Sequence, residues 1–215
     1  MKPTYIVGAK GAAKEIYYLI KRINHAKLTF DFKGFIDLDP EYSVLKIGSE
    51  NLSVFDESQF IQNQKEVCNI IFGVAFPNIL QAIIKKYTLK SIFHFPNVVH
   101  PNVQLDQSIF LGKGNVIAEA AVFTVDITLG DFNLINRGVH IGHDVVIGNG
   151  NVINPCAVVS GGINIKNHNL IGTNATIIQY LNIDSNNAIG AGAVITKSIS
   201  NHNTLIGVPA KPLKK

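Results

Sequence analysis

The chain of 215 residues is 47% hydrophobic, has only 16% charged residues and carries a formal net charge of +4. This length allows one large domain or two modest ones, and so few charges exclude a polybasic nucleic-acid-binding protein. Two cysteines, no apolar stretch of about 18 residues and no signal-peptide pattern predict a cytoplasmic protein without disulfides or a membrane-spanning helix.

The first 95 residues alternate between short apolar runs and helical patterns. We expect strands at residues 4–7, 32–37, 69–72 and 91–94, and helices through residues 16–23 and 78–86. A strand, a glycine-rich turn and a helix, in that order, open a nucleotide-binding unit. Residues 1–95 are therefore predicted to form a small, Rossmann-like α/β domain with a parallel sheet.

The turn after the first strand holds Gly8, Lys10 and Gly11. Glycines there let the backbone approach a ligand, and the helix N-terminus that follows favours phosphate. The turn lacks the third glycine of a dinucleotide fingerprint, and Asp37 comes 26 residues after Gly11 (37 − 11), later than a ribose-binding acid usually lies. We favour a nucleotide or nucleotide-sugar pocket that includes Gly73. Glycines that only form turns remain the alternative.

From Val99 to Ile195 every sixth residue is aliphatic or aromatic. A period of six fits neither an α-helix nor a flat strand, but is typical of a solenoid of short strands and tight turns. The residues four positions after successive anchors are Asn, a small residue and an aliphatic residue, in that order, from position 115 on. This order recurs every 18 residues and is broken only by Val139, so three hexads form one coil. Residues 96–215 are therefore predicted to form a three-sided solenoid, joined to the first domain near residues 95–101.

Two sets of residues recur at the corners of the predicted coils. We expect the asparagines to stack about 4.8 Å apart and bond along the axis, or to serve turns with left-handed backbone. The five asparagines are Asn115, Asn133, Asn151, Asn169 and Asn187. Glycines after the anchors are expected to form tight corners. They are Gly112, Gly130, Gly142, Gly148, Gly172 and Gly190.

One coil differs from the others at its turn. It carries His143 two positions after the anchor Ile141, followed directly by Asp144. An imidazole beside a carboxylate is suited to removing a proton near neutral pH. Two solvated turn residues are the alternative explanation, so the pair is a candidate catalytic site.

The Gly-Ala-x-Gly turn at residues 8–11, the Ile-Gly-His-Asp hexad at residues 141–144 and the Gly-Val-Pro-Ala-Lys segment at residues 207–211 resemble a known family. These features are similar to the bacterial sugar acetyltransferases of the bacillosamine and sialic-acid type, within the hexapeptide-repeat acyltransferases. The resemblance covers nearly the whole chain. It implies an α/β N-terminal domain followed by a left-handed parallel β-helix, and a homotrimer with active sites between adjacent subunits. It also implies acetyl-CoA as cosubstrate, no metal, and a nucleotide-linked sugar as acceptor.

The resemblance also implies roles for residues. His143 corresponds to the general base, Asp144 to the acid that orients it, and Gly161 to the backbone amide that binds the thioester oxygen. The implied acetyl-CoA contacts are Gly161, Thr173, Gly190, Ala191, Pro209 and Lys211. The implied contacts to the nucleotide sugar are Gly8, Lys10, Gly11, Asp37, Gly73 and Asn136.

Two positions depart from the family pattern. Val152 lies where many relatives have a second histidine, and Cys156 replaces a glycine that often precedes the alanine at residue 157. A valine side chain cannot form the hydrogen bond of that histidine. These changes leave the proposed base in place but alter the surroundings expected for its ligands.

The expected function is acetyl-CoA-dependent N-acetylation of a nucleotide-linked amino sugar for surface-glycan synthesis, with sugar O-acetylation as the alternative. A zinc site like that of β-helix carbonic anhydrases would need His140, His143 and His168, which we expect to point in different directions. A non-catalytic solenoid is disfavoured by the intact His143–Asp144 pair and by Gly161.

Overall fold

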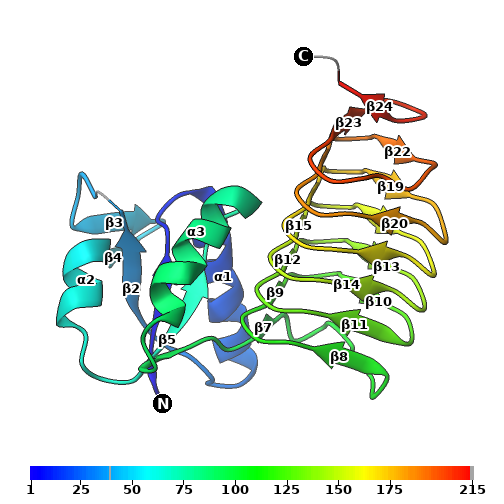
Figure 1. The fold of residues 1–215 in the computed structure, drawn as a ribbon. Coiled ribbons are helices and arrows are strands. Elements are labelled where there is room, and N and C mark those ends of the chain that lie inside the picture. The colour runs from blue at the N-terminus through cyan, green and yellow to red at the C-terminus, as the bar shows by residue number, and fades with distance from the viewer. Residues whose placement is uncertain (39, 214–215) are drawn as a thin grey trace.

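The computed structural model describes residues 1–38 and 40–213 and has two parts (Figure 1). An α/β part, coloured blue to green, lies beside a tall column of stacked coils that runs from green to red. No helix in the described ranges is both long and apolar enough to cross a bilayer. The α/β domain followed by a left-handed parallel β-helix confirms the predicted fold class.

The sheet of the α/β part has six strands in the order β3-β4-β2-β1-β5-β6. Its strands are β1 (Pro3–Val7), β2 (Asp31–Asp37), β3 (Val44–Ile47), β4 (Glu50–Asp56), β5 (Cys68–Phe72) and β6 (Phe93–His94). Its helices are α1 (Gly11–Ala26), α2 (Glu57–Asn63) and α3 (Pro77–Thr88). All neighbouring strands pair in parallel except β3 and β4. After β1 the chain continues to β2 on one side of the sheet, and after β5 it continues to β6 on the other side. The sheet therefore has a topological switch point between β1 and β5.

The four predicted strands and two predicted helices are present, but three elements were not predicted. The β3–β4 hairpin and the seven-residue α2 lie between residues 44 and 63. Gly48 in the hairpin turn has a φ of +59°, and Asp56 caps α2 by accepting the Gln59 N–H at 2.9 Å. These elements are short and depend on local turn and cap geometry, which hydrophobic periodicity does not reveal.

The β-helix has three faces, which we call A, B and C in the order in which the chain visits them. Face A consists of β7 (Val98–Val99), β9 (Val116–Ile117), β12 (Leu134–Ile135), β15 (Val152–Ile153), β18 (Leu170–Ile171), β21 (Ala188–Ile189), β23 (Thr204–Ile206) and the antiparallel β24 (Lys211–Pro212). Face B consists of β10 (Val122–Phe123), β13 (His140–Ile141), β16 (Val158–Val159), β19 (Thr176–Ile177) and β22 (Val194–Ile195). Face C consists of β8 (Ile109–Leu111), β11 (Ile127–Leu129), β14 (Val146–Ile147), β17 (Asn164–Ile165) and β20 (Asn182–Ile183).

The six-residue anchors fill the interior of the column. Anchors from Ile117 to Ile195 are buried in one continuous core, against which Val99, Leu105 and Leu111 of the first coils pack partly buried. Strands pair in register with the strand 18 residues later, as Ile117 does with Ile135. The predicted three-hexad coil is therefore confirmed.

The buried asparagines form a ladder at the corner between faces C and A. The Asn151 Nδ2 donates to Asn133 Oδ1 at 3.0 Å and to the Lys166 carbonyl at 2.9 Å. Its Oδ1 accepts from both nitrogens of Asn169, at 2.9 and 3.1 Å. The expected hydrogen bonding along the axis is confirmed. The asparagines themselves do not have the left-handed backbone that was given as the alternative. The residue before each one has it: Gly114, Phe132, Gly150, His168 and Asn186.

The glycines after the anchors lie at the corners between faces, as predicted, and they serve close packing between coils without a left-handed backbone. Gly142, Gly148 and Gly172 do not have the positive φ of a left-handed turn. A Cβ on Gly142 would lie 2.7 Å from the Gly161 backbone nitrogen, and one on Gly172 would lie 2.6 Å from that of Ala191. At these two positions a side chain would therefore force the next coil to shift.

Helix α1 packs the α/β part against the outer side of face A. Val98, Val116, Leu134 and Val152 share one core cluster with the apolar side of α1. Val152 is fully buried there. The absence of a polar side chain at position 152 therefore has a packing reason, because this position belongs to the layer between the two parts.

Candidate functional site

A first cavity, of about 540 Å³, lies at the switch point of the α/β sheet. Five residues predicted from the sequence line it together: Gly8, Lys10, Gly11, Asp37 and Gly73. The Gly8 N–H donates to the Ile36 carbonyl, and its φ is +99°. A Cβ on Gly73 would lie 2.7 Å from Ala13 of α1. The glycines thus let β1, β5 and α1 converge around the cavity.

The cavity has the electrostatics of an anion site at one end. Helix α1 begins there without a side-chain cap and without an acidic residue in its first turn, so its N-terminal N–H groups stay available. Lys10 adds positive charge at its wall, whereas the charge of Lys86 is balanced by Glu57. Glu57, which sequence reasoning missed, is buried in the lining and accepts from Lys86 Nζ at 2.7 Å. The site therefore suits a phosphate-containing ligand.

His143 and Asp144 lie at the corner between faces B and C. Their side chains remain 53% and 64% exposed, and Nδ1 of His143 lies 2.7 Å from Oδ2 of Asp144. A carboxylate only accepts hydrogen bonds, so we assign the proton to Nδ1, which leaves the Nε2 lone pair free. Asp144 has a φ of +56°, a conformation that Asp and Asn tolerate better than most residues.

Gly161 lies one coil above His143 and directly against the imidazole. A Cβ at position 161 would lie only 2.4 Å from His143 Nε2, so a side chain there would displace the ring. The Gly161 carbonyl accepts from Tyr180, and the Gly162 N–H donates to the His143 carbonyl. Within residues 1–38 and 40–213, the Gly161 N–H itself has no acceptor. The corner thus combines a free imidazole nitrogen with a free backbone donor.

The other residues predicted to bind the cosubstrate lie elsewhere. Thr173, Gly190 and Ala191 stack at the corner between faces A and B, where the Gly192 N–H donates to the Thr173 carbonyl at 2.8 Å. Pro209 and Lys211 belong to the final segment, which folds back beside β23. Within one chain, Thr173, Gly190 and Ala191 are therefore separated from His143 by the width of face B.

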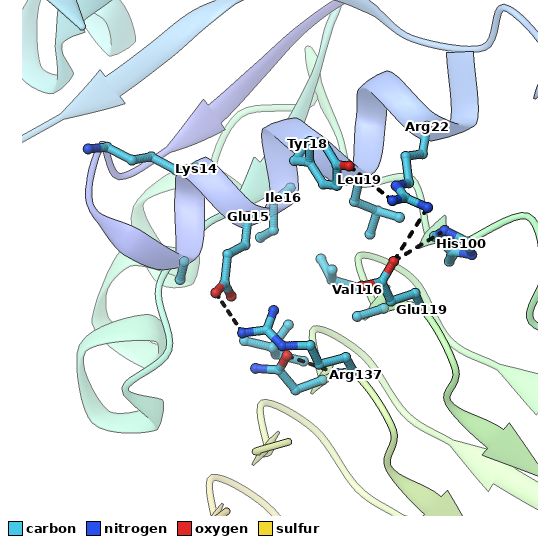
Figure 2. A pocket seen from close by; sticks show the side chains of 14 residues that line it. Lys14, Glu15, Ile16, Tyr18, Leu19, Arg22, His100, Val116, Glu119 and Arg137 are labelled. Carbon is cyan, nitrogen blue, oxygen red and sulfur yellow. Dashed lines mark hydrogen bonds and ion pairs between the residues drawn. The ribbon is translucent and has the colours of Figure 1, made fainter. Parts of the chain in front are cut away.

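A second cavity, of about 250 Å³, lies between α1 and face A, and we call it the interdomain cleft (Figure 2). Asn136 lines this cleft and not the first cavity, although it was grouped with the nucleotide-sugar contacts. Polar groups that sequence reasoning missed surround it: Glu15, Arg22, His100, Glu119 and Arg137. Their positions depend on how α1 docks against the β-helix, and no local motif marks them.

The two cysteines are free thiols in different surroundings. Cys68 is buried, and burial raises the pKa of its thiol to about 11. Cys156 is exposed, has a φ of +59° and lines a wider cavity that adjoins the interdomain cleft. The departure from glycine at this position thus places a thiol in a left-handed turn beside Arg137 and Gly138.

The three histidines considered for zinc lie on different sides of the column. His140 is on face B, His143 at the corner between faces B and C, and His168 at the corner between faces C and A. Among the residues with a described placement, no three His, Cys, Asp or Glu side chains form a metal-binding group.

Comparison with known proteins gives both a local and a global match. The family model "Bacterial transferase hexapeptide (six repeats)" matches residues 126–161, which include His143 and Gly161. No curated protein matches the chain in sequence. The chain is similar in structure to the acetyltransferase domain of PglB from Neisseria gonorrhoeae, with 26% identity, a TM-score of 0.87, and coverage of 99% of this chain and 100% of that one.

Two further solved structures resemble the chain over nearly its whole length. WeeI from Acinetobacter baumannii has 26% identity and a TM-score of 0.80, covering 98% of this chain and 99% of that one. PerB from Caulobacter crescentus, solved with CoA and GDP-perosamine, has 21% identity and a TM-score of 0.84, covering 99% and 97%. The chain thus shares the fold of the PglB acetyltransferase domain, WeeI and PerB in both of its parts.

Proposed function

We propose that this protein is an acetyltransferase that moves the acetyl group of acetyl-CoA to an amino group of a nucleotide-linked sugar. The observation that carries the proposal is the corner where His143 bonds to Asp144 and lies against Gly161, whose N–H has no acceptor within the described residues. The whole-chain similarity to the PglB acetyltransferase domain supports acyl transfer as the reaction class. The GDP-perosamine bound to PerB supports a nucleotide sugar as acceptor.

The geometry suggests a direct transfer between two bound substrates. The sugar amine attacks the thioester carbonyl, and His143 Nε2 takes the proton that the nitrogen loses. The Gly161 N–H donates to the oxyanion of the tetrahedral intermediate. The C–S bond then breaks, and the departing thiolate receives the proton from His143. Asp144 stabilises the imidazolium while it carries that proton.

The nucleotide part of the acceptor fits the cavity at the switch point. Its phosphates would accept from the N-terminal N–H groups of α1 and lie beside Lys10, as anions do at helix N-termini. Asp37 Oδ1 already accepts from the Leu38 N–H, which leaves Oδ2 for a hydroxyl of the ligand. A nucleotide held here leaves its sugar to extend out of the cavity.

A homotrimer would complete the active site. Thr173 and Ala191 lie across face B from His143, so the acetyl-CoA arm would meet both sets of residues only between two neighbouring chains. Exposed Val122 and Val158 on face B give such neighbours apolar surface to bury. We place the enzyme in the cytoplasm, where its free thiols stay reduced, and in surface-glycan synthesis.

The test is transfer from acetyl-CoA to a panel of nucleotide-linked amino and hydroxy sugars, followed by release of the CoA thiol. We expect amino sugars to react and His143→Ala to lower kcat by about 10²–10⁴-fold, because the general base is lost. Both proteins should have the mass of three chains by light scattering. An unchanged kcat in His143→Ala would remove this residue from the mechanism.

Asp144→Asn is the matched variant for the orienting carboxylate. Asparagine tolerates the left-handed backbone at this position, so the substitution removes the charge without straining the turn. We expect a smaller loss of kcat than in His143→Ala. A pH optimum that rises in Asp144→Asn would contradict the orienting role.

A further inference from the structure

An exposed cysteine lies at one end of a groove that follows the corner between faces A and B. Cys156 is a free thiol with a φ of +59°, a conformation that few residues other than glycine, Asn and Asp adopt readily. Gly138, one coil below, has no side chain to cover the sulfur, because a Cβ there would lie 3.3 Å from Sγ. The thiol is therefore accessible from the groove.

The groove has the dimensions of a short peptide. Its volume is about 510 Å³, and small residues form its floor, with Gly138 one coil and Ala120 two coils below Cys156. Asn102 lines the far end, three coils below Cys156. Three coils at strand spacing make about 14 Å. An extended tripeptide covers about 10 Å, so one attached to the sulfur reaches most of the groove.

The charged groups that line the groove are the guanidiniums of Arg22 and Arg137 and the carboxylate of Glu119. Arg137 donates to Glu15 at 2.9 Å, and Arg22 lies 3.7 Å from Glu119. Each guanidinium has five N–H donors and can therefore bind a further carboxylate. Glutathione, a tripeptide thiol, carries two carboxylates and one ammonium group. Its charges thus complement those of the groove.

A buried histidine near the far end has an unsatisfied donor. His100 is only 5% exposed, and its Nδ1 accepts from the Asn102 N–H at 3.2 Å, so the neutral ring carries its proton on Nε2. Within the described residues Nε2 has no hydrogen-bond partner. Figure 2 shows the imidazole facing Glu119, whose Oε2 is 3.9 Å away and so too far to accept. Buried polar groups rarely remain unpaired, so this donor points to a ligand with a carboxylate or amide oxygen.

We propose that Cys156 is a site of reversible modification, at which it forms a mixed disulfide with glutathione whose peptide occupies this groove. The Cys156 thiolate attacks one sulfur of glutathione disulfide, and a new S–S bond joins Sγ to that glutathione while the original S–S bond breaks. The second glutathione leaves as a thiol with the proton that Cys156 lost. Glutathione disulfide is the oxidant, and the reaction needs no other reagent.

The modification would interrupt acetyl transfer. Cys156 lies on the same corner as Asn136 below it and Thr173 above it, which are predicted contacts of the acceptor and of acetyl-CoA. A peptide on Cys156 therefore fills the space between the two ligands until a thiol reduces the disulfide. This consequence rests on the proposed function, whereas the formation of the mixed disulfide does not.

The experiment incubates the protein with glutathione disulfide and locates the products by peptide mass spectrometry. We expect one glutathione on Cys156 and none on the buried Cys68. Hydroxyethyl disulfide, which has neither charge nor peptide, measures the intrinsic reactivity of the thiol. The rate ratio of glutathione disulfide to hydroxyethyl disulfide should be about tenfold higher at Cys156 than for free cysteine, because the groove binds the charged peptide.

Charge variants test whether the groove provides this preference. Arg22→Gln and Arg137→Gln should each lower the rate ratio several-fold, because a partner for a glutathione carboxylate is lost. The ratio cancels any change in the reactivity of the thiol itself. Lys65→Gln is the matched control, since Lys65 is exposed and does not line the groove, and it should keep the full ratio.

The outcomes separate this inference from the proposed function. No glutathione on Cys156, or the same rate ratio in both arginine variants and the wild type, would overturn the binding of glutathione in the groove. After removal of the reagent, the wild type should release CoA slowly and recover with dithiothreitol, whereas Cys156→Ser should not respond to the treatment. A modified wild type with unchanged transfer would overturn the interruption. No transfer by the unmodified protein to any acceptor would overturn the proposed function instead, and the mass and rate measurements would still decide the modification.

Discussion

The positions of individual side chains were predictable where the six-residue repeat fixes their place in a coil. The hexad identifies His143 as a corner residue and Gly161 as its neighbour one coil later, since the two lie 18 residues apart (161 − 143). The contact between the imidazole and Gly161 follows from that spacing. His100 lies in the turn after β7, and its burial results from the docking of α1. Nothing in its neighbouring sequence marks it.

His168 gives a pH dependence of stability. Burial, followed by the charge of Lys85, lowers the pKa of His168 below its ordinary value of 6.5, and its buried Nδ1 has no partner among the described residues. The unfolded chain therefore binds a proton more readily than the folded one. Stability from this residue is full above pH 6.5 and falls as the pH drops below that value.

The variant His168→Asn should lose less stability than the wild type between pH 7.5 and pH 5 in urea unfolding. Asparagine also fits the left-handed backbone at this position. His202→Asn is the matched control, because His202 is also left-handed but exposed. An equally steep pH dependence in His168→Asn and the wild type would show that His168 is not the responsible group.

At the scale of elements, the solenoid was far more predictable than the α/β part. Each coil repeats the same three corners, so every hexad supports the assignment of the others. The β3–β4 hairpin and α2 have no such repetition, and their pairing is set by Gly48 and by the Asp56 cap. Stacking also changed the reason for particular residues, since Gly142 is needed for coil-to-coil contact and not for the turn itself.

The asparagine ladder should contribute strongly to the stability of the column. Asn151→Ala removes four side-chain hydrogen bonds and leaves both nitrogens of buried Asn169 and the Lys166 carbonyl without this partner, while Asn133 Oδ1 keeps the Asn151 N–H. We expect the free energy of unfolding to fall by about 3 kcal/mol or more in urea titrations. Asn164→Ala, on the exposed side of face C, should change it by less than about 0.5 kcal/mol. Equal effects of the two variants would refute the ladder's role.

At the scale of the whole molecule, the sequence predicted two parts but not how they dock. The apolar outer residues of face A could equally have faced solvent or another chain, because periodicity only distinguishes inside from outside. The structure pairs them with α1 and so creates the interdomain cleft, which shares Ala12 with the cavity at the switch point of the sheet. Asn136 belongs to this cleft, which explains why it is separate from Gly8 and Asp37.

Val152 tests this docking. Val152→His would bury an imidazole in a tightly packed apolar layer, so we expect the free energy of unfolding to fall by about 2 kcal/mol. The control Val44→His, at an exposed position of β3, should be nearly neutral. If both variants unfold at the same urea concentration as the wild type, the layer is less tightly packed than described.

The reversed direction of β24 has a consequence for the protein at high concentration. The last coil of a column of parallel coils exposes unpaired backbone N–H and C=O groups, to which a strand of another molecule can bind. Here that end offers an antiparallel strand with Lys211 and with Pro212, which has no N–H to donate. On face A an incoming chain therefore cannot extend the parallel ladder beyond β23, whereas faces B and C end in β22 and β20.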